Sequence, residues 1–260
     1  MSNRTFETIL WEQDGGVGTI TINRPEQFNG MTNTMLRETH ELLHDVAGDD
    51  SVTVVVLTGA GKAFCPGADL KHYTSGAPNE PNRDEYFDVP VMLHEMPQVT
   101  IAAINGACAG AGLGWACGCD LRYAARSAKL NTAFLDVAVA GDMGLPWTLP
   151  RLVGAGRARE LSLFPRKLTA DEAAAIGLVN GAFDDETFRE DVRELVERIA
   201  GAAPLARRSM KEHYVAAESM GFGEFIAMET KAHGTITASE DCKEAFRAFV
   251  EKRTPRFQGK

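Results

Sequence analysis

A run of very small residues directly after a predicted buried strand is the feature that most constrains this chain. Val99–Ile104 is apolar and rich in β-branched residues, which predicts a strand inside the protein. Gly106–Gly114 follows it and consists largely of glycine and alanine. A second loop rich in small residues, Thr58–Leu70, follows another predicted buried strand, Val52–Leu57. Small residues allow a ligand to approach the backbone closely, so both loops are candidate binding segments.

Several interpretations of these loops are open from the residues alone. Where such a loop enters a helix, the first N–H groups have no internal acceptor and the helix dipole favours negative charge. Two such donors converging on one oxygen would form an oxyanion hole. A dinucleotide-binding fingerprint is excluded, because Trp115 stands where its last glycine is required. Tight packing of helix against strand is the remaining alternative, and these residues do not decide between it and an oxyanion hole.

Alternating strand and helix patterns predict a layered α/β core over the first two-thirds of the chain. From about Leu145 onward the pattern is nearly all helical, and Thr169–Glu172 fits a capping box. We place a core at residues 1–195 and a C-terminal helical segment at 196–260. The strands are predicted at 8–12, 17–22, 52–57, 99–104, 121–125 and 128–130, and the helices at 32–47, 84–96, 187–200, 204–218, 222–233 and 240–252.

Composition narrows the function further. The formal net charge of −9 argues against a nucleic-acid partner, because phosphate contacts need a basic face. No stretch approaches the roughly 18 apolar residues of a membrane span, and no signal pattern is evident at the N-terminus. The five cysteines are an odd number and miss the common zinc spacings, so we expect reduced thiols, a cytoplasmic protein and no metal site.

Several segments spread over the whole chain form a recognisable pattern. They are Ile20–Pro25, Val54–Lys71, Ile101–Gly106 with the glycine-rich stretch after it, Cys119–Arg122, Leu149–Gly154, Ala173–Asn180 and Glu251–Gly259. In order and spacing this pattern resembles the crotonase (enoyl-CoA hydratase/isomerase) family from end to end. The resemblance implies an α/β fold in which βαβ units form a spiral, followed by a C-terminal helical trimerisation segment. It also implies a homotrimer, or a hexamer built as a dimer of trimers.

The resemblance further implies an acyl-CoA thioester substrate, with no cofactor beyond the coenzyme A that belongs to the substrate. By position, the N–H groups of Ala68 and Ala111 are the expected oxyanion donors. Ala111 stands where the family usually has glycine, which keeps the N–H group and adds a methyl group near the thioester. The residues expected to contact substrate are Arg24, Ala68, Asp69, Leu70, Lys71, Phe134, Phe257 and Lys260.

The chain departs from the hydratases of that family at two positions. Hydratases resemble one another in carrying two glutamates that hold and activate water, and these positions correspond here to Gly114 and Phe134. Neither residue can exchange a proton, so hydration by a pair of glutamates is not expected. Asp142 matches an aspartate that is catalytic in related dienoyl-CoA isomerases and nucleophilic in related aryl-CoA dehalogenases. Capping of the helix that begins near Gly144 is the alternative role for Asp142.

These observations predict an enzyme that stabilises a thioester enolate, with isomerisation favoured over hydration and Asp142 as the single acid–base group. One alternative is a non-catalytic acyl-CoA-binding protein that keeps the thioester site. Another is an aryl-CoA dehalogenase or hydrolase in which Asp142 attacks carbon as a nucleophile.

Overall fold

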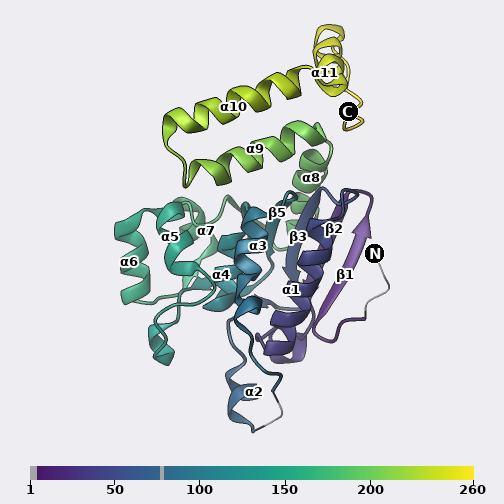
Figure 1. Cartoon of the computed structure of the whole chain (residues 1–260). Coiled ribbons are helices and arrows are strands. Elements are labelled where there is room, and N and C mark those ends of the chain that lie inside the picture. The colour runs from purple at the N-terminus through teal and green to yellow at the C-terminus, as the bar shows by residue number, and fades with distance from the viewer. Residues whose placement is uncertain (1–4, 77–78) are drawn as a thin grey trace.

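A six-stranded main sheet forms the centre of the computed structural model, which describes residues 5–76 and 79–260 (Figure 1). The strand order is β1-β2-β3-β5-β7-β10; β1 and β2 pair antiparallel and all other neighbours pair parallel. The strands are β1 (Ile9–Asp14), β2 (Val17–Ile22), β3 (Val54–Gly59), β5 (Val99–Ile104), β7 (Leu121–Ala125) and β10 (Gly181–Phe183).

A second, smaller sheet consists of short strands in the order β4-β6-β8-β9. These are β4 (Ala63–Cys65), β6 (Ala107–Ala109), β8 (Lys129–Asn131) and β9 (Leu168–Thr169). The chain passes from β3 to β4, from β5 to β6 and from β7 to β8, so each turn adds one strand to each sheet. This repeated path is the spiral that the sequence predicted.

Helices connect and cover the two sheets (Figure 1). The α-helices are α1 (Asn33–Ala47), α2 (Leu70–Thr74), α3 (Val89–Glu95), α4 (Ala111–Gly118), α5 (Leu145–Val153), α6 (Ala155–Leu163), α7 (Ala170–Ala175), α8 (Phe188–Ala200), α9 (Pro204–Ala217), α10 (Phe222–Thr237) and α11 (Glu240–Glu251). Short 3-10 helices lie at η1 (Pro25–Gln27), η2 (Asp84–Asp88) and η3 (Leu135–Val137).

Both faces of the main sheet are buried, as the β-branched composition of its central strands predicted. Along β3, Val55 and Leu57 face the larger core with α1, α3 and α4, whereas Val54 and Val56 face α8. Successive side chains of a strand point to opposite faces, so a strand covered on both sides must be apolar throughout. Thr32 caps α1 by accepting a hydrogen bond from the N–H group of Met35.

Most predicted elements are confirmed, and the differences have local causes. The hairpin, the strand at 99–104, the strand at 121–125 and the capping box at Thr169 are present. The region after Leu145 is not all helix, because Leu168–Thr169 and Gly181–Phe183 are strands. β10 is only three residues long and contains glycine, so its sequence has no alternating pattern that would predict a strand paired with β7. The predicted helix at 84–96 is split into η2 and α3, where Pro90 lies in the first turn of α3.

The C-terminal helices α9, α10 and α11 extend away from the two sheets (Figure 1). The predicted boundary between residues 195 and 196 lies within α8, whose Val192 and Val196 both pack against the main sheet. α9 begins at Pro204 and contributes one fully enclosed side chain, Lys211. Its ammonium group donates to the carbonyl oxygens of Leu93 (3.1 Å) and Gln98 (2.8 Å) and lies 2.8 Å from the carboxylate of Asp120.

We expect Lys211→Met to destabilise the fold by about 3 kcal/mol or more, because the partly buried Asp120 carboxylate loses its cation and the carbonyls of Leu93 and Gln98 lose the ammonium donor. The Lys211 side chain is only 5% exposed, so water cannot replace the lost contacts fully. Chemical denaturation measures the change. The double variant Lys211→Met, Asp120→Asn should recover part of the loss, and a single-variant effect below about 1 kcal/mol would contradict the assignment.

Candidate active site

The first candidate loop leads from β4 to α2 and is held by a short pairing with the segment before α1. Met31 donates its N–H to the carbonyl of Gly67 (2.8 Å), and Asp69 donates its N–H to the carbonyl of Met31 (2.9 Å). In such a parallel bridge the bonds use the neighbours of Ala68 and turn its own N–H to the opposite side. In the described part of the chain, the N–H group of Ala68 has no acceptor.

Arg24 and Asp69 fix this loop by pairing with each other. The Arg24 guanidinium lies 2.9 Å from the Asp69 carboxylate and donates to the carbonyl of Gly30. The same carboxylate caps α2 by accepting from the N–H of His72 at 3.0 Å. Burial opposes ionisation of Asp69, but the His72 N–H and the Arg24 guanidinium outweigh it and hold its pKa below the ordinary value. The structure therefore assigns these two side chains a positioning role that the sequence did not predict.

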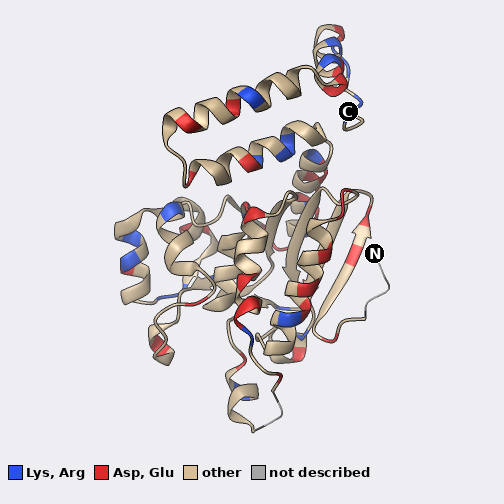
Figure 2. Ribbon diagram, in the orientation of Figure 1, with Lys and Arg blue, Asp and Glu red and all other residues tan. Residues whose placement is uncertain are grey.

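The second candidate loop leads from β6 through Gly110 into α4. Gly110 has φ 51° and ψ −126°, a conformation that only glycine adopts easily. Ala111 is the first residue of α4, and its N–H has no acceptor among the residues that the structure describes. Every residue of α4 is buried, and the helix carries no charged side chain (Figure 2). The partial positive charge at the start of α4 therefore lies in an apolar surrounding, where it acts most strongly on an anion.

The two loops pack against each other backbone to backbone. A Cβ atom placed on Gly112 would lie 2.1 Å from the carbonyl oxygen of Cys65. One placed on Gly67, whose φ is 101°, would lie 3.6 Å from the nitrogen of Ala111. The glycines thus serve the tight packing that was one interpretation of the sequence. The same packing brings Gly67, the residue before Ala68, next to the nitrogen of Ala111, so the N–H groups of Ala68 and Ala111 belong to backbone segments that are in contact.

Gly114 is the point where α4 meets the segment that carries Asp142. A Cβ atom at Gly114 would lie 2.6 Å from the Cβ of Met143 and 3.2 Å from the backbone oxygen of Asp142. These distances leave no space for a side chain at position 114 unless the Asp142–Met143 backbone moves. Gly114 lies about one helical turn after Ala111. Because it has no side chain, the segment that carries Asp142 can pack directly against α4 at this point.

Asp142 is half-buried and does not cap a helix. Its carboxylate accepts one hydrogen bond, from the N–H of Met143 at 2.8 Å, and α5, which has Gly144 as its N-cap, has no side-chain cap. The capping hypothesis is therefore wrong. Burial raises the pKa of Asp142 above its ordinary value, and the Met143 N–H opposes part of that shift. A half-buried carboxylate with a raised pKa and a free oxygen is suited to proton transfer.

Of the other predicted contacts, some lie near the two loops and some lie at the far end of the molecule. The ring of Phe134 lies 3.7 Å from the site of a Cβ on Gly110, so it lines the same end of α4. Leu70 and Lys71 are exposed on α2. Phe257 and Lys260 lie beyond α11, at the end of the molecule opposite α2 (Figure 1). Within one chain, the C-terminal end therefore lies well away from α2, which begins two residues after Ala68 (Figure 1).

A polar pair near the first loop was not predicted as such. The Tyr73 hydroxyl donates to the side-chain oxygen of Asn33 at 2.9 Å. Tyr73 stands out in the sequence as an aromatic residue soon after the loop, but Asn33 gave no signal beyond its place next to the helix-capping Thr32.

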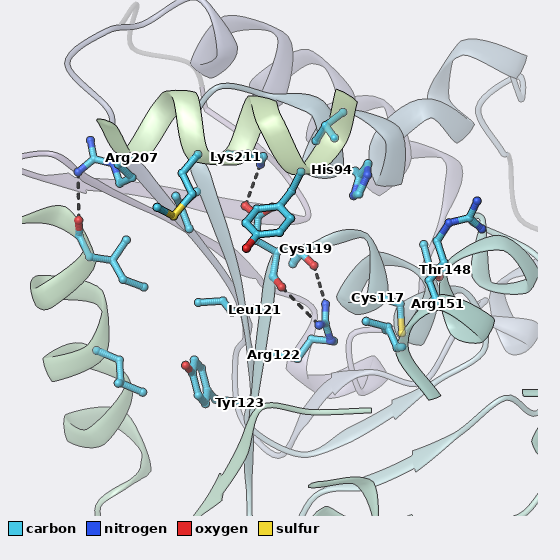
Figure 3. A pocket seen from close by; sticks show the side chains of 18 of the residues that line it. His94, Cys117, Cys119, Leu121, Arg122, Tyr123, Thr148, Arg151, Arg207 and Lys211 are labelled. Atoms are coloured by element: carbon cyan, nitrogen blue, oxygen red, sulfur yellow. Dashed lines mark hydrogen bonds and ion pairs between the residues drawn. The ribbon is translucent and has the colours of Figure 1, made fainter. Parts of the chain in front are cut away.

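A cavity of about 740 Å³ lies elsewhere, between α9, α5 and the beginning of β7 (Figure 3). It touches α4 only at its far end, through Cys117 and Cys119. Its buried cations already have partners. Figure 3 shows the pairing of Lys211 with Asp120 and of Arg122 with the carbonyl of Cys119. Lys211 also donates to two further carbonyls, and Arg122 to that of Leu178. We interpret this cavity as a gap in the packing between the C-terminal helices and the core rather than as the thioester site.

Comparison with known proteins identifies the family of the chain. The family model for enoyl-CoA hydratase/isomerase matches residues 12–260. A probable enoyl-CoA hydratase of Rhodobacter capsulatus and the 1,2-epoxyphenylacetyl-CoA isomerase of Escherichia coli are each 35% identical, over 98% of this chain and all of theirs. The crystal structure of an enoyl-CoA hydratase from Bacillus anthracis is 35% identical and superimposes with a TM-score of 0.90, over 98% of this chain and 100% of that one. The chain therefore belongs to the enoyl-CoA hydratase/isomerase, or crotonase, family and has its fold.

Proposed function

We propose that this enzyme isomerises acyl-CoA esters through a thioester enolate held between the N–H groups of Ala68 and Ala111. The observation that carries the proposal is that both N–H groups lack an acceptor while their loops are packed together. Fixed donors that need no reorganisation stabilise a developing oxyanion far better than water does. The start of α4 adds its dipole to the same point.

Asp142 is the proposed acid–base group. Its carboxylate would remove a proton from one carbon of the acyl chain while the electron pair moves onto the thioester oxygen. The same group, now a carboxylic acid, would return the proton to a different carbon, so the double bond moves and no water is consumed. One carboxylate suffices for this reaction, whereas hydration also needs a group that activates water. The relative in Escherichia coli is itself named an isomerase.

We also propose a homotrimer, or a hexamer made of two trimers. Apolar side chains on the C-terminal helices support it: Phe222 begins α10 and is 81% exposed, and Phe249 on α11 is 85% exposed. Exposed apolar patches of this kind mark protein contacts. A neighbouring chain would also bring Phe257 and Lys260 to a site that lies well away from them within their own chain. The free cysteines of the described chain support the proposal of a cytoplasmic location.

The assembly can be tested on the intact chain. Multi-angle light scattering should give a mass three or six times that of one chain, independent of concentration over the usual range. Phe249→Glu should shift the species towards the monomer without unfolding α11, as circular dichroism would report. A wild-type chain that stays monomeric would contradict the proposal.

Ala111→Pro tests the oxyanion donor directly. Proline is well tolerated at the first position of a helix but has no N–H group, so α4 should persist while the donor is lost. We expect kcat for a 3-enoyl-CoA to fall by about 10²- to 10³-fold. Ala111→Gly keeps the N–H group and is the matched control, with activity close to wild type. Equal activity of the proline and glycine variants would exclude an oxyanion hole at this residue.

Asp142→Asn should lower kcat by at least about 10²-fold, because amides do not exchange protons at neutral pH. In the wild type, kcat/KM should fall as pH decreases through the raised pKa of Asp142, since the base must be ionised. An acyl group found attached to Asp142 by mass spectrometry would instead indicate a nucleophile. Tight ester binding with no turnover in the wild type, and no change in Asp142→Asn, would favour a binding protein.

Although Asp142→Asn should lower activity, it should raise the stability of the fold at neutral pH. A carboxyl group whose pKa is raised in the folded state binds its proton more tightly when folded, so stability decreases as pH rises from about 3.9 through the folded pKa. At pH 7 the half-buried negative charge of Asp142 therefore lowers the free energy of unfolding, and Asp142→Asn removes this charge. Its midpoint of thermal unfolding should exceed that of the wild type at pH 7 and converge with it in acid.

A further inference from the structure

Tyr73 and Asn33 form a hydrogen-bonded pair beside the first loop whose orientation is fixed. The side-chain nitrogen of Asn33 donates to the carbonyl oxygen of Glu80 at 2.7 Å, which turns the amide oxygen of Asn33 towards Tyr73. That oxygen cannot donate, so the hydrogen of the Tyr73 hydroxyl points to it across 2.9 Å. The lone pairs of the phenol oxygen therefore remain available on its other side.

This oxygen belongs to the helix that directly follows the loop of Ala68, the first proposed oxyanion donor. Tyr73 is on α2, four residues after Asp69, and its N–H donates to the carbonyl of Asp69. Asn33 is two residues from Met31, whose backbone brackets Ala68. Burial, and then the negative charges of Asp69 and Asp142, raise the pKa of the Tyr73 phenol, as expected for a hydroxyl within electrostatic range of the first loop and of the proposed acid–base group.

Holding the fold does not explain the pair by itself. Tyr73 is 41% exposed, and α2 is already capped by Asp69 and tied to Arg24. Asn33, in contrast, is buried and uses both ends of its amide. A buried amide that orients a partly exposed hydroxyl is an arrangement that presents the hydroxyl oxygen to a ligand.

We propose that Tyr73 determines substrate specificity, its phenol oxygen accepting a hydrogen bond from a hydroxyl group on the acyl chain of the CoA ester while Asn33 holds the phenol hydrogen. The inference rests on the proposed thioester site. It predicts a preference for acyl groups that donate a hydrogen bond over acyl groups of the same length that only accept one. Asn33 is the positioning residue, because it acts through Tyr73.

Binding of three esters to the full-length chain tests the proposal without requiring turnover. The probes are 3-hydroxybutyryl-CoA, which has a donor, 3-oxobutyryl-CoA, which has only an acceptor, and butyryl-CoA, which has neither. Calorimetry gives the affinities, and mass spectrometry after each titration verifies that the esters are unchanged. The variants are Tyr73→Phe and Asn33→Ala. The control is Tyr123→Phe, because the Tyr123 ring stacks on Phe183 of β10 and lines the separate cavity beside α9.

The wild type and Tyr123→Phe should prefer the hydroxylated ester. Tyr73→Phe should bind it about five- to tenfold more weakly and leave butyryl-CoA within about twofold, as expected for one neutral hydrogen bond. Asn33→Ala frees the phenol hydrogen, so affinity for 3-oxobutyryl-CoA should rise relative to butyryl-CoA. A merely structural pair would change all three affinities together.

The outcomes separate this inference from the proposed function. Equal effects of Tyr73→Phe on all three esters, or no effect on any, would overturn the role of Tyr73 even if the enzyme isomerises 3-enoyl-CoA. Selective weakening together with a wild type that turns over no enoyl-CoA would overturn the proposed reaction and leave the role of Tyr73 standing. Failure of the wild type to bind butyryl-CoA would overturn the thioester site and with it this inference.

Discussion

Backbone contact between two loops is the constraint on which the rest of the site depends. Gly112 meets the carbonyl of Cys65 at a distance that no side chain permits, and Gly67, whose φ is 101°, lies against the nitrogen of Ala111. This closeness is possible because the strands that lead into the loops, β4 and β6, are neighbours in the small sheet. The main sheet has an ordinary apolar core on both faces and serves to hold that small sheet in place. The unpaired N–H groups are thus a product of topology, and their chemistry needs no particular side chain at residues 68 and 111.

Charge is distributed around the site in two different ways. Asp69 is stabilised as an anion by Arg24 and the start of α2, so it is fixed and unreactive at neutral pH. Asp142 has one backbone donor and is held in a less favourable environment, which keeps its proton affinity high. Two carboxylates near one loop are thereby given separate tasks, one in holding the loop and one available for proton transfer.

Much of the fold was predictable because its signals are local. A few neighbouring residues were enough to predict three features: the β-branched strand β3, the hairpin with its glycines and the capping box at Thr169. β9 and β10 were missed because they are short and are defined by partners far away in the chain. The N–H groups of Ala68 and Ala111 could be named from the resemblance to a family. The pairing of Arg24 with Asp69 could not, since nothing in the sequence distinguishes a long-range ion pair from two ligand contacts. The same holds for Asn33, whose role depends on the carbonyl of Glu80.

The close contact between Gly114 and Met143 limits which residue can stand at position 114. A glutamate at position 114 and the present path of residues 142–143 occupy the same volume, so they are mutually exclusive states of one site. A single substitution cannot convert one into the other, because the new side chain displaces the backbone that carries the existing acid. Steric exclusion therefore couples the residue at position 114 to the conformation of the segment that carries Asp142.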